Sequence, residues 1–382
     1  MDSLDTIEEF RKVNASFPYT EPVKAWKNQG KKVIGWICNY VPEEIIHAAG
    51  MLPFRITGDS KEIEMPDGDA YLHIYSCSYT RSCCQLAAEG QLGFLDGFAA
   101  TAMCDGSRRL ADVLDHYGFV PCISTIGVPR KFDESAEGLY RREILQFKQE
   151  IENFVKTEIS NESLRDSIEV YNRSRQLLKE LYEIRRLDSP PITGAETLEV
   201  LNACMRMPRE EFTAALERLL AELKGGRETP EWRARLMLNG SILQNVEFVK
   251  GIEELGGLIV TDALCNGARY WEGVVDTTMD PIPALVDYYL RKFPCPRFYP
   301  PKVNNDKVLD LVEEYRVEGV IYNIIRYCNN HAWDYPILKA RLEEKGIPIL
   351  QLDVEYGMGA TGQIKTRAQA FIEMLEERRG AK

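Results

Sequence analysis

The sequence of 382 residues has no long apolar run near its start, no short internal repeat and no low-complexity tract. Residues 1–17 include several acidic side chains and no continuous apolar core, which excludes a secretory signal peptide and a membrane span in this stretch. Hydrophobic residues make up 45% of the chain and charged residues 28%, as in ordinary globular proteins. We therefore expect a cytoplasmic protein without a membrane partner, folded into two or three domains.

Positive charge is also scarce, because 47 Lys and Arg residues are outnumbered by 59 Asp and Glu residues, for a net charge of −12. General nucleic-acid binders neutralise phosphates with basic side chains, so no nucleic-acid partner is expected. Two nucleotide-binding motifs are missing as well. No phosphate loop of the form GxxxxGK followed by Ser or Thr occurs, and LNGSILQN (238–245) has one glycine where a dinucleotide loop has three.

The ten cysteines include no CxxC pair. Closed zinc sites in short segments are built from such pairs, so their absence argues against a zinc finger. In a reducing cytoplasm, cysteines are more often free, metal-bound or catalytic than joined in disulfides. An iron–sulfur cluster fits better than zinc, because the fold can bring its thiolate ligands together from distant segments. The alternative is that cysteines serve as small buried side chains, which is the role expected for Cys122 and Cys204.

Short β-branched or aromatic runs alternate with helical periodicity in the first third of the chain, a pattern typical of parallel β-α units. The expected strands there are residues 32–38, 52–56, 71–75, 96–102 and 120–126, and the expected helices are residues 41–50, 80–90 and 105–118. The alternation returns near the C-terminus, with strands expected at 235–240, 257–262, 319–325 and 347–353 and a closing helix at 366–379.

Between these regions, long charged amphipathic segments at residues 140–159 and 163–187 predict a helical domain, interrupted at Ser189-Pro190-Pro191. Residues 225–233 are expected to form a linker. The predicted organisation is an N-terminal α/β domain with candidate cysteines (1–134), a helical domain (135–230) and a C-terminal α/β domain (231–382).

Several cysteines fall at the expected carboxyl ends of strands, where open parallel sheets bind their ligands. Cys77 follows the run at 71–75, Cys104 follows 96–102 and Cys328 follows 319–325, while Cys38 and Cys265 are placed in the same way. A site shared by these residues must be assembled by the fold, since they lie far apart in the sequence.

Four ordered stretches carry most of these features: GWICNYVPEEIIHAAGMLPFRITG (35–58), SCSYTRS (76–82), MCDGSRRL (103–110) and VEGVIYNIIRYCNNHAWDYPILK (317–339). Together they resemble the superfamily of 2-hydroxyacyl-CoA dehydratases and class I benzoyl-CoA reductases, over nearly the whole chain. The resemblance implies two Rossmann-like (flavodoxin-like) parallel-sheet domains with an intervening helical domain. It also implies one 4Fe–4S cluster, whose three ligands, carried over motif by motif, are Cys77, Cys104 and Cys328.

The segment at 263–290, in which GARYWEG is followed by DPIPAL, resembles the small C or N subunit of ATP-dependent benzoyl-CoA reductase. Small (beta) subunits of 2-hydroxyacyl-CoA dehydratases share the cysteine motifs but are less similar here. The resemblance thus implies low-potential, one-electron reduction of benzoyl-CoA to a cyclohexadienoyl-CoA. The alternatives are formation of an enoyl-CoA by a radical dehydratase, and an electron-transfer or double-cubane protein without a substrate site of its own.

Cysteines beyond the three-ligand set are weaker ligand candidates, namely Cys83, Cys84, Cys265 and Cys295. Related double-cubane proteins use additional cysteines for a second cubane. They place one after the strand at 235–240, where this chain has Ser241, so the resemblance favours a single cubane.

The resemblance also implies three partners: a larger homologous subunit, an acyl-CoA substrate, and a separate iron–sulfur activator that hydrolyses ATP. The activator has to be another chain, because this one lacks a phosphate loop.

Other polar residues near the motifs are weaker candidates. His331, three residues after Cys328, suits either a proton donor or a structural cap. Glu43 and Glu44 begin an expected helix, where they complement the helix dipole or contact a substrate, and Glu44 is a candidate catalytic residue. Residues 106–109 begin another helix with two arginines, which suits either a CoA phosphate or solvent.

Overall fold

The computed structural model describes residues 4–60, 64–227 and 231–380. Two four-stranded sheets lie in this part of the chain, and all paired strands run parallel. The first sheet, in the order β2-β1-β3-β4, contains β1 (Val33–Trp36), β2 (Leu52–Arg55), β3 (Gly97–Thr101) and β4 (Cys122–Ile126). The second, in the order β6-β5-β7-β8, contains β5 (Ala234–Gly240), β6 (Gly257–Ala263), β7 (Gly319–Ile325) and β8 (Ile349–Val354). The predicted α/β class with two Rossmann-like sheets is confirmed.

Both sheets have the same doubly wound strand order, so each has a switch point where the connections leave to opposite sides. These points lie between β1 and β3 in the first sheet and between β5 and β7 in the second. Ligands of such sheets bind beyond the carboxyl ends of the strands at the switch point. Cys38 and Cys104 follow β1 and β3, and Ser241 and Cys328 follow β5 and β7. The topology therefore brings cysteines to the switch points of both sheets.

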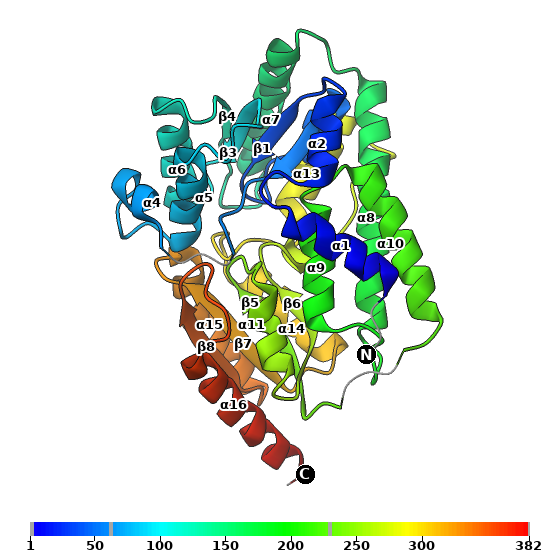
Figure 1. Cartoon of the computed structure of the whole chain (residues 1–382), viewed down its shortest axis with the longest axis vertical. Coiled ribbons are helices and arrows are strands. Elements are labelled where there is room, and N and C mark those ends of the chain that lie inside the picture. Colours follow the sequence, from blue (N-terminus) through cyan, green and yellow to red (C-terminus); the bar gives the residue numbers. More distant parts are fainter. Residues whose placement is uncertain (1–3, 61–63, 228–230, 381–382) are drawn as a thin grey trace.

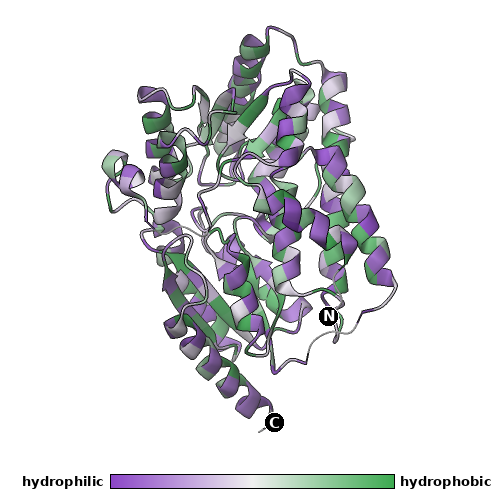
Figure 2. Ribbon diagram, viewed as in Figure 1, coloured by the Kyte–Doolittle hydropathy of each residue, from purple (hydrophilic) through white to green (hydrophobic). Residues whose placement is uncertain are grey.

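Helices accompany each sheet (Figure 1). Those of the first sheet are α3 (Glu43–Ala48), α4 (Pro66–Tyr71), α5 (Ser78–Ala88) and α6 (Asp105–His116). Those of the second are α11 (Val246–Glu253), α12 (Ala268–Trp271), α14 (Lys302–Glu314), α15 (Asn329–Glu344) and α16 (Gly362–Gly380). In contrast, α13 (Pro281–Arg291) lies near the first sheet, where it packs against α7 (Glu134–Val155) and α8 (Asn161–Ile184). Figure 2 shows the strands as mainly hydrophobic, whereas the helices alternate between hydrophobic and hydrophilic residues along their length.

The remaining helices lie beside both sheets, and they are α1 (Asp5–Ala15), α2 (Glu21–Asn28), α7 (Glu134–Val155), α8 (Asn161–Ile184), α9 (Gly194–Cys204) and α10 (Arg209–Lys224). Side-chain caps begin three of them: Asp133 caps α7, Ser160 caps α8, and Thr193 with Glu196 forms a capping box on α9. The interruption predicted at residues 189–191 falls between α8 and α9. Because α8 packs against α3 and α13, while α9 packs against α11 and β6, this helical layer joins the two sheets.

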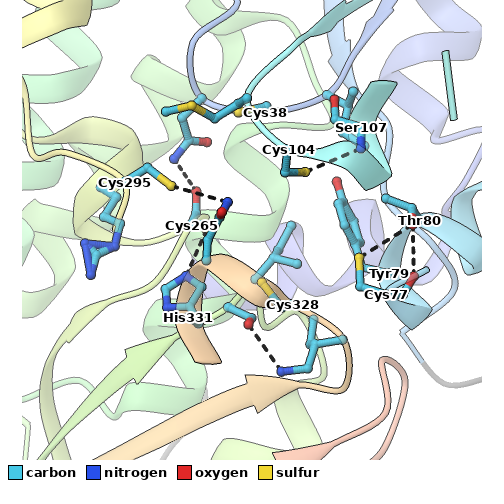
Figure 3. A pocket seen from close by; sticks show the side chains of 18 of the residues that line it. Cys38, Cys77, Tyr79, Thr80, Cys104, Ser107, Cys265, Cys295, Cys328 and His331 are labelled. Atoms are coloured by element: carbon cyan, nitrogen blue, oxygen red, sulfur yellow. Dashed lines mark hydrogen bonds between the residues drawn. The ribbon is translucent and has the colours of Figure 1, made fainter. Parts of the chain in front are cut away.

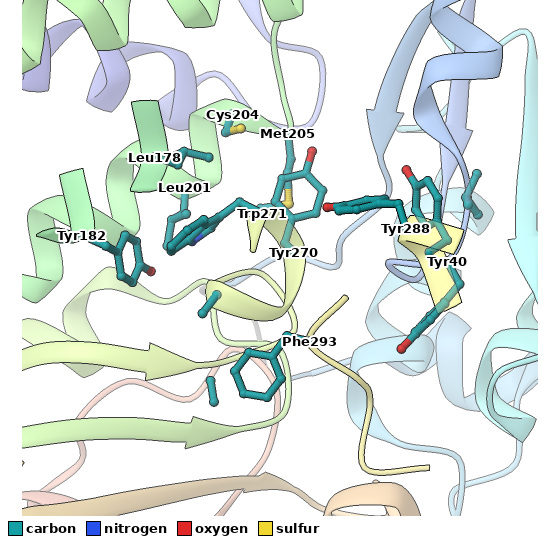
Figure 4. Close-up of a cluster of buried hydrophobic side chains, with 14 of the residues drawn as sticks. Tyr40, Leu178, Tyr182, Leu201, Cys204, Met205, Tyr270, Trp271, Tyr288 and Phe293 are labelled. Carbon is teal, nitrogen blue, oxygen red and sulfur yellow. The ribbon is translucent and has the colours of Figure 1, made fainter. Parts of the chain in front are cut away.

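A continuous hydrophobic cluster runs through the three regions, from Trp36 in β1 through Tyr182 in α8 to Tyr322 in β7. Figure 4 shows the part of it where Tyr182 meets Trp271, with ring centroids 4.5 Å apart. The domain boundaries at 134 and 230 stay a prediction, and residues 228–230 of the predicted linker lie outside the described residues. In the described ranges, no helix combines the length and apolar character needed to cross a membrane.

One predicted strand is wrong. Residues 71–75 do not join a sheet, since α4 ends at Tyr71 and the side chains of Ile74 and Tyr75 are 55% and 64% exposed. The aromatic run that suggested a strand instead makes lateral ring contacts, between Tyr71 and Phe119 and between Tyr75 and Tyr327. The consequence for the site is that Cys77 follows a loop and begins α5, rather than ending a strand.

Two buried ion pairs fasten α3 to the helical layer. Glu44 bonds to Arg175 of α8 at 2.5 Å and accepts a hydrogen bond from Tyr289 at 2.8 Å. Glu43 pairs with Arg209 of α10 at 3.1 Å. Burial alone would raise the pKa of Glu44, but Arg175 and the hydrogen bonds outweigh it and hold that pKa below its ordinary value. The two carboxylates therefore act as buried structural groups, beyond the helix-dipole role that their position in the sequence indicated.

Candidate functional site

The carboxyl ends of the two sheets meet at an inner cavity of about 110 Å³ (Figure 3). Six of the ten cysteines line it: Cys38, Cys77, Cys104, Cys265, Cys295 and Cys328. All ten cysteines are free. The volume is far above the ~10–15 Å³ needed by one water, and a cavity of this size left empty would cost about 3 kcal/mol of stability. The lining is thus suited to a bound group that contacts sulfur.

The three cysteines expected to be ligands share one local arrangement: Cys77, Cys104 and Cys328 are the N-cap residues of α5, α6 and α15. The unpaired backbone N–H groups and the dipole at a helix N-terminus favour negative charge, including that of a thiolate. The Cys104 sulfur accepts a hydrogen bond from the backbone N–H of Ser107, at 3.4 Å. The fold therefore directs three helix N-termini at one set of thiols.

Without a bound metal, two of these thiols strongly favour the neutral, protonated form. Burial, and then the nearby thiol of Cys77, raise the pKa of Cys104 well above its ordinary value and that of Cys328 to about 12. Such thiols become thiolate ligands when a metal centre supplies compensating positive charge.

The donor set fits an iron–sulfur cluster better than a single ion. Within residues 4–60, 64–227 and 231–380, no three His, Cys, Asp or Glu side chains converge closely enough to hold one metal ion. A cubane spaces its ligands more widely, because each thiolate bonds a different iron. The cysteine thiols of the lining, three of them at helix N-termini, match this requirement.

A second, outer pocket of about 420 Å³ shares Cys77, Cys104 and Cys328 with the inner cavity. Arg130 and Arg297 line it too. The three cysteines thus line both the inner cavity and a pocket whose wall includes exposed side chains such as Tyr75 and Tyr327.

His331 lines the inner cavity and is 1% exposed. Its Nδ1 lies 3.0 Å from the hydroxyl of Tyr322, and its Nε2 lies 3.9 Å from the sulfur of Cys265. Burial, and then the nearby Arg269, lower the pKa of His331 well below its ordinary value, so the imidazole is neutral. The role of His331 as a proton donor stays a prediction.

Other candidates are placed away from the cavity lining. Cys83 and Cys84 are fully buried in α5 and belong to the core of the first sheet. The guanidinium of Arg109 forms exposed ion pairs with Asp105 and Asp112. The weaker ligand candidates Cys265 and Cys295 do line the cavity, and so does Cys38, which was left out of the predicted ligand set. Its position after β1 was the available signal, although its left-handed backbone (φ 77°) is visible only in the structure.

A buried lysine lies next to this site. Lys292 is 5% exposed, and its Nζ donates a hydrogen bond to the carbonyl of Asn39 at 2.9 Å. Burial, and then the charge of Arg175, lower the pKa of Lys292 to about 7. The folded chain therefore disfavours the ammonium form that the unfolded chain holds up to a pH near 10.

This predicts a pH-dependent stability, measured in the presence of a chelator so that no metal contributes. Between pH 7 and pH 9.5 the unfolded state binds the lysine proton more strongly than the folded state, so the free energy of unfolding rises with pH, by about 3 kcal/mol. Urea unfolding of wild type and Lys292→Met would measure this change. As the pH rises, the free energy of unfolding of wild type should increase relative to that of Lys292→Met. Lys179→Met, on the exposed face of α8, is the control and should give a constant difference. A constant difference for Lys292→Met would contradict the buried-lysine assignment.

Comparisons with known proteins identify a family and relatives that cover most of the chain. Residues 38–375 match the family model described as 2-hydroxyglutaryl-CoA dehydratase, D-component. The C subunit of benzoyl-CoA reductase from Thauera aromatica is 27% identical, with 98% of this chain and 99% of the relative covered. The beta subunit of (R)-phenyllactyl-CoA dehydratase from Clostridium sporogenes is 25% identical (92% and 94% covered). The beta subunit of (R)-2-hydroxyglutaryl-CoA dehydratase from Acidaminococcus fermentans is 27% identical (97% and 98% covered).

Proposed function

The chain belongs to the family of the 2-hydroxyglutaryl-CoA dehydratase D-component, as its four motifs predicted, and we propose that it is an iron–sulfur subunit of an enzyme that reduces acyl-CoA thioesters by single-electron transfer. The observation that carries the proposal is the convergence of Cys77, Cys104 and Cys328, each the N-cap residue of a helix, on one cavity between two switch points. These three residues would hold a 4Fe–4S cluster.

When bound, such a cluster supplies one-electron transfer at a potential that charge, hydrogen bonding and exposure can tune. Residues of this chain would set the hydrogen bonding and the exposure of such a cluster. The N–H of Ser107 donates to the Cys104 sulfur, and the hydroxyl of Thr80 lies 3.5 Å from the Cys77 sulfur. Apolar side chains, including Met103 and Phe293, line the inner cavity and limit its hydration.

Benzoyl-CoA is the proposed substrate, reduced with two electrons and two protons to a cyclohexadienoyl-CoA. Support comes from the resemblance of residues 263–290 and from the relative named as the C subunit of a benzoyl-CoA reductase. Residues of that segment form buried hydrogen bonds within the chain. Tyr270 donates to Glu43. At the cavity wall, Arg269 donates to Asn239 and Asn304. A thioester is too large for the inner cavity, so we propose that it approaches from the outer pocket, together with a larger partner subunit.

Dehydration of a 2-hydroxyacyl-CoA is the second candidate, because relatives named as dehydratase beta subunits are about as similar over more than nine-tenths of this chain. It would yield an enoyl-CoA with no net redox change. Electron transfer without a substrate site in this chain is the third.

The test combines the anaerobically prepared chain with its candidate partner subunit, an ATP-hydrolysing activator and ATP. We expect benzoyl-CoA to give a cyclohexadienoyl-CoA by mass spectrometry, with ATP and the activator both required. If the complex converts a 2-hydroxyacyl-CoA but not benzoyl-CoA, dehydration replaces reduction of benzoyl-CoA as the proposed reaction. Failure to convert either, by a complex that contains iron, would overturn the proposed substrate class.

A further inference from the structure

Two buried arginines, Arg55 and Arg269, line the inner cavity, and each is 2% exposed. They come from different halves of the chain, since Arg55 ends β2 of the first sheet and Arg269 lies in α12, beside the second. The third basic side chain of the lining, His331, is neutral. Within the described residues, no Asp or Glu lines this cavity. The wall therefore carries positive charge and no carboxylate to balance it.

The guanidinium of Arg269 is held by neutral groups. It donates to the carbonyl of Pro294 at 3.2 Å and to the side-chain oxygens of Asn304 and Asn239, at 3.0 and 3.1 Å. In the part of the chain that the structure describes, it forms no ion pair, and its Nε has no hydrogen-bond partner. These contacts fix the orientation of the guanidinium without neutralising its charge.

The guanidinium of Arg55 is held in the same way. It donates to the side-chain oxygen of Asn39 at 2.9 Å, to the carbonyl of Cys265 at 3.1 Å and to the sulfur of Met205 at 3.3 Å. Among the described residues, no carboxylate pairs with it, and its Nε also has no partner. The buried Arg175 is different, because Glu44 supplies its counter-charge at 2.5 Å.

The two positive charges act on the sulfurs of the cavity. Burial raises the pKa of Cys265, whereas Arg269 and then Arg55 act on this pKa in the opposite direction. A buried cation without a counter-charge is unfavourable, and a negatively charged occupant of the cavity would compensate it. An iron–sulfur cluster with thiolate ligands is such an occupant, and it becomes more negative when it accepts an electron. Positive charge beside the cavity thus stabilises the reduced state more than the oxidised state.

We propose that Arg55 and Arg269 set the reduction potential of the cluster on Cys77, Cys104 and Cys328, by stabilising its reduced state with two fixed positive charges. The inference rests on the proposed function, and it deepens that function by assigning the residues that control how readily the chain accepts an electron from the activator. Both arginines act through their charge and the hydrogen bonds that orient them, without contacting a substrate.

The test is an anaerobic redox titration of the full-length, iron-loaded protein, followed by electron paramagnetic resonance. At the midpoint potential of wild type, we expect Arg269→Met to lower the ratio of reduced to oxidised cluster by at least about tenfold, which is a shift of about 59 mV for a one-electron couple. Arg55→Met, on the other side of the cavity, should shift the midpoint in the same direction. Arg269→Lys and Arg55→Lys keep the charge and should stay close to wild type.

The matched control is Arg109→Met, the same substitution in α6, the helix that begins after Cys104. The Arg109 side chain is 50% exposed and pairs with Asp105 and Asp112, so solvent and these carboxylates screen its charge. We expect its ratio of reduced to oxidised cluster to change by less than about threefold. Circular dichroism and iron content establish that each variant is folded and loaded.

The outcomes separate this proposal from the proposed function. If both Met variants retain iron and the midpoint of wild type, the role of the arginines is wrong and the cluster assignment stands. Equal shifts in Arg269→Met and Arg269→Lys would assign the effect to lost hydrogen bonds and would also overturn the role of charge. Because Arg55 and Arg269 lie beside different sheets, a folding defect in one variant leaves the other to decide. A folded wild-type chain without iron would overturn both proposals.

Discussion

Replacing Cys104 with serine is expected to remove the iron that we propose is held by Cys77, Cys104 and Cys328, and to lower electron transfer by more than about a hundredfold. Cys104 is central to the account because it lines both the inner cavity and the outer pocket, caps α6 and receives the Ser107 N–H. Serine offers a harder oxygen with a far higher pKa, which iron–sulfur clusters seldom accept in place of a thiolate.

The matched control is Cys122→Ser, the same chemical change in β4, at a residue that lines neither space. It should keep wild-type iron and activity. Both variants should have wild-type circular dichroism, because the change is a single atom. If Cys104→Ser retains the iron and electron transfer of wild type, the assignment of this residue as a ligand is wrong.

The second large effect is on stability: Glu44→Ala should lower the free energy of unfolding by about 3–5 kcal/mol. The Glu44 side chain is fully buried, and its removal leaves the guanidinium of Arg175 and the hydroxyl of Tyr289 without their carboxylate. A buried charge that has lost its partner costs much more than the pair contributes. Urea unfolding of the iron-free chain measures the change.

Two comparisons make this result specific. Replacing the pair together, Glu44→Leu with Arg175→Met, should recover much of the lost stability, since no unpaired charge remains. Glu183→Ala breaks the exposed pair with Lys179 on α8 and should cost less than about 1 kcal/mol. Equal effects of Glu44→Ala and Glu183→Ala would contradict the role of Glu44 as a buried link between α3 and α8.

The sequence indicated the sheets because their signal is local. Runs such as 235–240 and 319–325 are apolar and β-branched, and they form β5 and β7 close to the expected bounds. The run at 71–75 is also largely apolar and aromatic, but its rings contact neighbours on the surface, and only tertiary packing decides between these outcomes.

The site was predictable where position along a strand determined it, as for Cys104 and Cys328. Neighbours in sequence were misleading: Cys83 and Cys84 lie about two turns into α5 after Cys77, so the helix carries them into the core. Cys38 and Cys295 join the lining from segments far apart in the sequence, and the partners of Glu43 and Glu44 lie more than a hundred positions away. Such contacts depend on how the elements pack, which no local pattern encodes.

The most direct test of the central claim is the iron and acid-labile sulfide content of the anaerobically purified chain, compared with a variant in which Cys77, Cys104 and Cys328 are all serine. We expect iron and sulfide in equal amounts in wild type, and loss of the iron held by these three residues in a variant that remains folded. A folded wild-type chain with no iron, or with zinc and no sulfide, would contradict the claim.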